Sequence, residues 1–241
     1  MTDLIQLRLF RKDIPFTHEQ FYEQYRYISA DFNEHVVLES GRGGRYSIAA
    51  FNPEKIFIGH DGQLQVVEQE KTQTLNGDPF HLLKEQLAAY RVHQDEGIPG
   101  GAFGYISYDY ARYIEDLPKI AKDDLGIPML IFFVCEQWFV FDHAKKQLSL
   151  YFLAESENSN TLKQRMLFWE EQWLKKIEPT SSKPLETVVE GELEVSMSEA
   201  EFMAAVTKIQ RYISQGDVFQ VNLSVRQSNR FMLLGWRFTR N

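Results

Sequence analysis

The sequence predicts an α+β fold, because strand patterns and helix patterns occupy separate stretches of the chain. Strand signals cluster in residues 35–67 and 100–153, where short apolar runs are separated by turns. Apolar residues at helical spacing occupy other segments, of which 162–177 is the clearest. The length of 241 residues is enough for one large domain, or for one and a half domains of ordinary size.

The composition is that of a globular protein, with 44% hydrophobic and 25% charged residues. A net charge of −8 counts against a nucleic-acid partner, because phosphate binding depends on Lys and Arg. The single cysteine, Cys135, can form neither an internal disulfide nor a cysteine-rich zinc site. No apolar run approaches the roughly 18 residues of a membrane span, and the first residues lack the layout of a signal peptide. We therefore expect a cytoplasmic protein that binds neither nucleic acid nor membrane.

The first predicted elements are an edge strand and a helix. Residues 4–10 alternate weakly between apolar and polar side chains, which fits an edge strand. Thr17 followed by Gln20 is a capping-box pattern and marks the start of a helix. The apolar face of this helix is expected at Phe21, Tyr25 and Ile28.

Two strand pairs and a second helix follow. The four strands are expected at residues 35–39, 45–49, 55–58 and 64–67. The first pair flanks the glycine loop 41–44, and the second flanks Asp61-Gly62, a dipeptide that tolerates the positive φ of a two-residue turn. Asp78 and Pro79 then form a helix start.

The middle of the chain returns to strands before a third helix. Residues 100–108 carry a strand signal, and 129–141 is the strongest strand of the sequence. Both faces of 129–141 are apolar, so we expect it in a sheet that is covered on both sides. Residues 142–147 are predicted to be a hairpin loop, 148–153 the returning strand and 162–177 a helix.

The character of the sequence changes near residue 178. Proline, serine and acidic residues with little periodicity predict a linker over 178–195. Ser198 and Glu201 form a second capping box, and Gly216 supplies the stop for the helix between them. Residues 218–225 alternate and are predicted to form a strand.

Two segments carry candidate chemistry, whereas the histidines have no metal-ligand spacing and no phosphate-loop or nucleophile motif occurs. The glycine loop could hold a carboxylate on its N–H groups, with Ser40, Arg42 and Arg45 beside it. A plain hairpin connection with two solvated arginines fits the local sequence as well. In residues 100–115, three glycines in one strand indicate close packing or a ligand, and the aromatic residues fit a core better than a cofactor site.

Three segments together resemble a known family. They are residues 37–48, which contain Val-Leu-Glu-Ser and Gly-Arg-Tyr-Ser-Ile, the Gly-Gly-Ala-Phe-Gly-Tyr-Ile-Ser-Tyr-Asp-Tyr-Ala-Arg-Tyr-Ile-Glu-Asp-Leu-Pro run at 100–118, and residues 214–226. In this order they resemble the signatures of the chorismate-utilising synthases, component I of anthranilate synthase and of aminodeoxychorismate synthase. Asn222 and the amino-acid sequence of residues 109–115 look more like those of the aminodeoxychorismate synthases.

The resemblance implies part of a two-sheet α+β sandwich with outer helices, of the anthranilate synthase component I type. Its domains would be 1–177 (amino-terminal domain), 178–195 (linker), 196–227 (start of the chorismate-binding domain) and 228–241 (an atypical basic tail). The family's catalytic and magnesium-binding motifs belong to the carboxy-terminal part, and none of them occurs here. We therefore expect an amino-terminal fragment, truncated before most of the chorismate-binding half and without synthase activity. A frameshift would account for the tail, and a basic amphipathic anchor is the alternative.

The resemblance also implies ligands and a partner. Ser40, Gly43, Gly44, Arg45 and Tyr46 match a pocket that holds tryptophan in the family, and a second wall of that pocket would come from the missing half. The intact enzyme would use Mg²⁺, with no cofactor expected for the fragment itself. With ammonia from a glutamine amidotransferase subunit, it would aminate chorismate to 4-amino-4-deoxychorismate for 4-aminobenzoate and folate. The alternatives are an anthranilate synthase component I fragment for tryptophan biosynthesis, a non-catalytic tryptophan- or amidotransferase-binding module, and an unfolded fragment with exposed sheet edges.

Overall fold

The structure is a computed structural model that describes residues 7–40, 43–69, 71–90, 92, 100–120, 123–155, 159–177 and 187–233. The chain divides into two compact units, residues 1–178 and 179–241. The first unit holds two five-stranded antiparallel sheets with helices, so the α+β prediction is confirmed.

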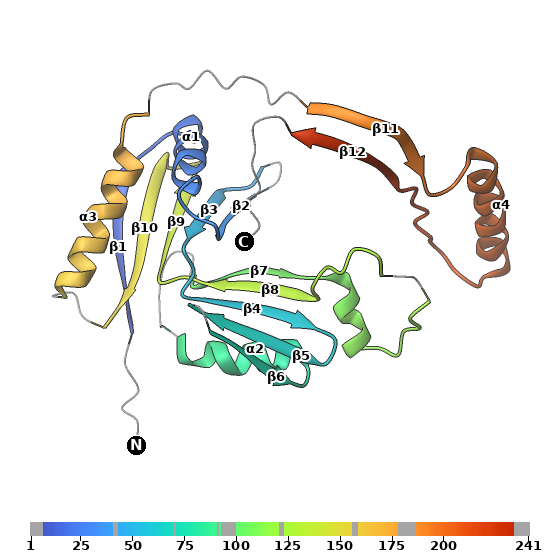
Figure 1. Ribbon diagram of the computed structural model, residues 1–241, viewed down its shortest axis with the longest axis horizontal. Coiled ribbons are helices and arrows are strands. Elements are labelled where there is room, and N and C mark those ends of the chain that lie inside the picture. Colours follow the sequence, from blue (N-terminus) through green and yellow to red (C-terminus); the bar gives the residue numbers. More distant parts are fainter. Residues whose placement is uncertain are drawn as a thin grey trace. The chain divides into compact units, whose positions relative to one another are not determined.

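The first sheet contains strands that are far apart in sequence (Figure 1). Its order is β1 (Arg8–Pro15), β10 (Gln147–Ala154), β9 (Gln137–Asp142), β3 (Tyr46–Phe51) and β2 (His35–Glu39). β1 is an edge strand, as predicted, and it continues to Pro15, beyond the predicted end at residue 10; residues 4–6 of that prediction lie outside the described residues. The β2–β3 pair is in register from His35 opposite Phe51 to Glu39 opposite Ser47, which places the glycine loop at its tip.

The second sheet has the order β6 (Lys71–Asn76), β5 (Gln63–Glu68), β4 (Lys55–His60), β8 (Leu130–Val134) and β7 (Ala102–Ile106). The prediction of one strand over 129–141 was wrong, because the chain leaves β8 after Val134 and enters β9 in the other sheet at Gln137. Both halves are apolar because each is packed on a hydrophobic core, so the sequence pattern contains no break at this crossing.

Helices cover both sheets and bury their apolar faces. These are α1 (His18–Ser29), α2 (Pro79–Leu87) and α3 (Asn160–Leu174), with the 3₁₀ turns η1 (Ala88–Tyr90) and η2 (Tyr108–Tyr113). The Thr17 capping box is present at the start of α1, and Asp78 caps α2 through the N–H groups of Phe80 and His81. α3 packs on β10 and α1, and α2 packs on β4 and β5.

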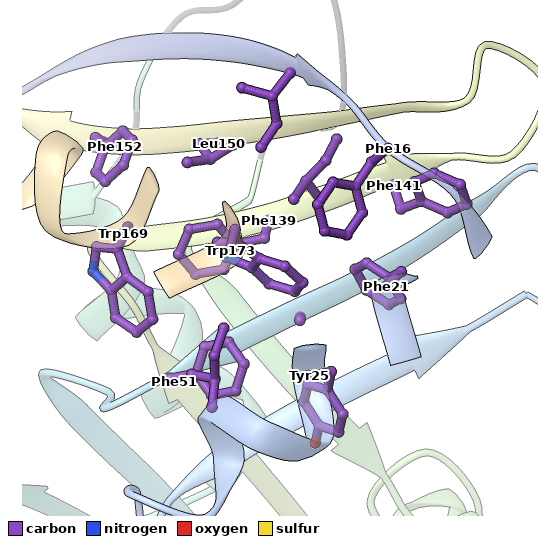
Figure 2. Packing of buried hydrophobic residues seen from close by; sticks show 14 of the residues in the cluster. Phe16, Phe21, Tyr25, Phe51, Phe139, Phe141, Leu150, Phe152, Trp169 and Trp173 are labelled. Carbon is purple, nitrogen blue, oxygen red and sulfur yellow. The ribbon is translucent and has the colours of Figure 1, made fainter. Parts of the chain in front are cut away.

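Figure 2 shows the aromatic core between helices α1 and α3 and the first sheet. The Phe21 ring stacks on Trp173 with centroids 5.4 Å apart, and Phe51 stacks on Trp169 at 5.5 Å. A second buried cluster joins the two sheets, with Phe103 of β7 at 6.2 Å from Trp138 of β9. The first sheet is therefore covered on both faces along β9.

The second unit consists of β11 (Thr187–Val195), α4 (Glu199–Gln215) and β12 (Gln227–Leu233). The Ser198 capping box and the left-handed Gly216 cap, with φ of 82°, match the prediction. β11 pairs antiparallel with β12, so residues 187–195 of the predicted linker form a strand. The strand predicted over 218–225 is absent from the described structure, because the pairing partner of β11 is the segment that begins at Gln227.

The rest of the predicted linker, 178–186, and the end of the predicted tail, 234–241, lie outside the described residues. Among the described helices, none has the length and apolar character needed to cross a membrane.

Candidate functional site

The described residues of the predicted carboxylate site lie together at the tip of the β2–β3 hairpin. The Ser40 N–H donates to the Tyr46 carbonyl at 3.2 Å, and the Ser40 hydroxyl donates to the same oxygen at 2.6 Å. Gly44 packs directly on Ser40, since a Cβ added at Gly44 would lie 1.8 Å from the Ser40 Cβ. Gly43 has a φ of +81°, and an added Cβ there would meet no atom within 4 Å. Arg42 lies outside the described residues.

Arg45 is attached to the turn between β9 and β10. Its Nε donates to Asp142 Oδ2 at 3.1 Å, and its Nη2 donates to the same oxygen at 2.9 Å. The guanidinium also lies over the Tyr46 ring, 5.0 Å from the ring centroid. The Arg45 carbonyl accepts from the His143 N–H at 2.9 Å, so both its backbone and its side chain bind this turn.

Asp142 is the electrostatic centre of this arrangement. The residue is 7% exposed, and its Oδ1 accepts from the N–H groups of Ala144 and Lys145 at 3.0 and 3.2 Å. Burial raises the pKa of Asp142, but the hydrogen bonds from Arg45 and the turn outweigh it and leave the pKa below its ordinary value. The same bond raises the pKa of Arg45. The pair is therefore ionised across the physiological range.

A polar cluster continues from the hairpin toward α1. The hydroxyl of Ser47 lies 2.8 Å from His143 Nε2 and 3.5 Å from the hydroxyl of Tyr22. The ring of His18 lies 5.1 Å from that of His143. Burial is the largest cause of the raised pKa of Tyr22, and Glu39 adds to it. Asp142 and His143 lie beside the hairpin although the sequence of the 142–147 loop indicates only a turn.

In the second candidate segment, 100–115, close packing explains Gly100 and Gly104, whereas Gly101 has a positive φ of 122°. A Cβ at Gly104 would lie 1.8 Å from the Ile131 carbonyl oxygen of β8, and one at Gly100 would lie 2.5 Å from the Trp138 ring. The expectation that the aromatic residues form core holds only for Phe103, which is buried. Tyr110 instead donates to Asp78, and Tyr113 donates to Asp61 at 3.1 Å and stacks on Tyr110.

Other predicted features carry no chemistry of their own. Cys135 is buried, which raises the pKa of its thiol to about 12. Within the described part of the chain, no three His, Cys, Asp or Glu side chains come together as a metal site. The hairpin thus stands out for its chemistry: a fixed cation beside an open glycine turn is suited to bind an anionic group.

Comparison with known proteins identifies the relatives of this chain. Residues 34–238 match the family model described as chorismate binding enzyme. The chain is 36% identical to aminodeoxychorismate synthase component 1 of Bacillus subtilis over 93% of its own length and 48% of that protein. It is 35% identical to anthranilate synthase component 1 of Thermus thermophilus over 80% of its length and 40% of that protein.

A solved structure agrees with these matches. The fold is similar to the crystal structure of anthranilate synthase component I from Streptococcus pneumoniae, with a TM-score of 0.57 and 26% identity over 79% of this chain and 43% of that one. The chain spans about half the length of the curated relatives that it matches. With a family match over most of its residues, it belongs to the chorismate-binding enzymes.

Proposed function

We propose that this chain is the amino-terminal part of an aminodeoxychorismate synthase component I. The observation that carries the proposal is the 36% identity to the Bacillus subtilis enzyme over 93% of the chain. The whole enzyme would aminate chorismate to 4-amino-4-deoxychorismate, the route to 4-aminobenzoate and folate. A glutamine amidotransferase subunit would deliver the ammonia.

A second candidate is the corresponding part of an anthranilate synthase component I. The Thermus thermophilus relative, at 35% identity over 80% of the chain, favours it almost as strongly. The S. pneumoniae structure supports the shared fold and does not separate the two.

Magnesium belongs to the proposal for the whole enzyme rather than to this chain. The described residues do not fit a magnesium site, since no cluster of three candidate ligands occurs among them. The contribution of this chain would be a folded partner for the catalytic remainder, and the isolated chain would have no synthase activity.

A chimera tests this proposal. Residues 1–227 are joined to the remainder of the Bacillus subtilis protein, and chorismate, Mg²⁺ and ammonium are supplied. We expect the chimera to form 4-amino-4-deoxychorismate and the isolated chain to form no aminated product. A matched chimera with the remainder of the Thermus thermophilus protein tests the second candidate, and we expect it to be the less active. Circular dichroism of each protein separates misfolding from inactivity.

We also propose that the β2–β3 hairpin binds the carboxylate of an aromatic amino acid. Two features support carboxylate binding: the half-exposed Arg45 guanidinium and the positive φ at Gly43. The Ser40 hydroxyl donates its proton to the Tyr46 carbonyl, so its oxygen would accept from the ammonium group of the amino acid. Calorimetry with L-tryptophan tests it, with Arg45→Ala and Ser40→Ala as variants. Saturable heat that Arg45→Ala abolishes supports the site, and no heat from the wild type at millimolar ligand contradicts it.

A further inference from the structure

We propose that Asp142 is a positioning residue for anion binding at the β2–β3 hairpin, where it holds the Arg45 guanidinium in place for a ligand carboxylate. The inference rests on the carboxylate site proposed above. It assigns to that site a residue 97 positions away in the sequence, in the turn after β9.

Arg45 is held from two directions although its side chain is 51% exposed. One edge, formed by Nε and Nη2, bonds to Asp142, and the face of the guanidinium lies over Tyr46. An exposed arginine ordinarily samples many rotamers, and fixing them costs free energy when a ligand binds. Here the contacts with Asp142 and Tyr46 would supply part of that ordering before a ligand arrives.

Asp142 is itself rigidly attached. One carboxylate oxygen, Oδ1, caps the turn through the N–H groups of Ala144 and Lys145. The other oxygen, Oδ2, takes the two short hydrogen bonds from Arg45. An asparagine at this position would keep an Oδ1 for the turn and for a longer bond of 3.3 Å from Arg45 Nε. Its amide group would replace Oδ2, the oxygen that accepts from both Nε and Nη2 of Arg45. Asp142→Asn therefore removes the two shorter hydrogen bonds that fix the guanidinium and spares the turn.

The geometry leaves one edge of the cation for a ligand. Nη1 of Arg45 has no acceptor among the described residues, and the second N–H of Nη2 remains available to share a carboxylate. Space is available beside Gly43, because no atom of the described residues lies within 4 Å of a Cβ built there. A carboxylate arriving from this side would meet a guanidinium of fixed orientation, the arrangement expected of a supported binding site.

The test compares L-tryptophan with tryptamine, which lacks the carboxylate, by calorimetry. We expect Asp142→Asn to bind L-tryptophan about 3- to 10-fold more weakly than the wild type, since the variant must order Arg45 on binding. The affinity for tryptamine should be the same for the wild type and for Asp142→Asn. Asp61→Asn is the matched control: Asp61 also pairs with a cation, Lys119, but at the β4–β5 turn of the other sheet, and its loss should leave tryptophan binding unchanged.

Three negative results are distinguishable. If the wild type gives no heat with L-tryptophan, the proposed carboxylate site itself fails, and the role of Asp142 fails with it. If the wild type binds and Asp142→Asn binds equally well, only the positioning role is overturned. A weaker response of Asp142→Asn to both ligands would also overturn it by showing a general loss of structure. The Arg45 Nε–H signal in NMR spectra, protected in the wild type and averaged in the variant, reports the contact without any ligand.

Discussion

Gly44 is the hairpin position where the structure tolerates a side chain least. A Cβ at this position would lie 1.8 Å from the Ser40 Cβ and 2.9 Å from the Ser40 Cα, on the opposite side of the hairpin. Ordinary contact begins near 3.4 Å, so Gly44→Ala requires the two sides of the hairpin to separate by about 1.6 Å at this point. That separation would break the Ser40–Tyr46 hydrogen bonds.

Overpacking of this kind costs about 1–3 kcal/mol of the free energy of unfolding, and each lost hydrogen bond adds about 1 kcal/mol. Gly43→Ala is the matched control, because its Cβ would meet open space and only the positive φ would cost about 1 kcal/mol. Urea unfolding of the three proteins measures both effects, and amide exchange at Ser40 reports the hairpin directly. We expect Gly44→Ala to be the more destabilised and to exchange faster. Equal stability of Gly44→Ala and the wild type, or a larger loss in Gly43→Ala, would refute this account of the hairpin.

Three further predictions follow from the described contacts. In chemical denaturation, Trp173→Ala should lose about 3–5 kcal/mol of the free energy of unfolding. Trp173→Phe should lose clearly less, because the buried indole Nε1 has no hydrogen-bond partner among the described residues. Equal losses would contradict the packing shown in Figure 2. The lowered pKa of Asp142 stabilises the folded protein above the ordinary carboxyl pKa of about 4, and this stability is lost as the pH falls through the pKa of the folded state. Asp142→Asn should therefore flatten the pH dependence of the free energy of unfolding below about pH 4. An unchanged slope would count against the ion pair with Arg45. Cys135, whose thiol pKa is raised to about 12 by burial, should resist a thiol reagent at pH 8 until denaturant is added, and rapid labelling of the native protein would be inconsistent with its burial.

Local patterns were sufficient where local contacts decide the structure. The Thr17 and Ser198 capping boxes involve residues three positions apart, and both are present as predicted. The Asp61-Gly62 turn joins adjacent strands, and Gly62 has the positive φ of 76° that its type implies. In each case the sequence neighbours are also the structural partners.

Contacts between residues that are far apart in the sequence could not be predicted from sequence patterns. Nothing near Arg45 points to Asp142, because the contact exists only once β3 and β9 are neighbours in the first sheet. The sequence also shows no break where the chain changes sheet between Val134 and Gln137. The strands before and after this point are both apolar, because each is buried in a hydrophobic core. Residues 187–195 look like part of a linker in the sequence, because the strand β11 forms only by pairing with β12.

The candidate site shows the same division. The sequence and its family resemblance indicated Ser40, Gly43, Gly44, Arg45 and Tyr46, which lie together in the hairpin. Their carboxylate-binding role stays a prediction. The role of Gly44 proved different from that of its neighbour: Gly43 provides a positive φ, whereas Gly44 is needed because Ser40 occupies the space of its side chain. A glycine required for close approach and one required for φ look identical in a sequence.

The most direct test of the proposed function is the amination of chorismate by the chimera of residues 1–227 with the remainder of the Bacillus subtilis aminodeoxychorismate synthase component 1, assayed beside the isolated chain. The account predicts 4-amino-4-deoxychorismate from the chimera and no aminated product from the chain alone. A folded chimera without activity, or turnover by the isolated chain, would contradict it.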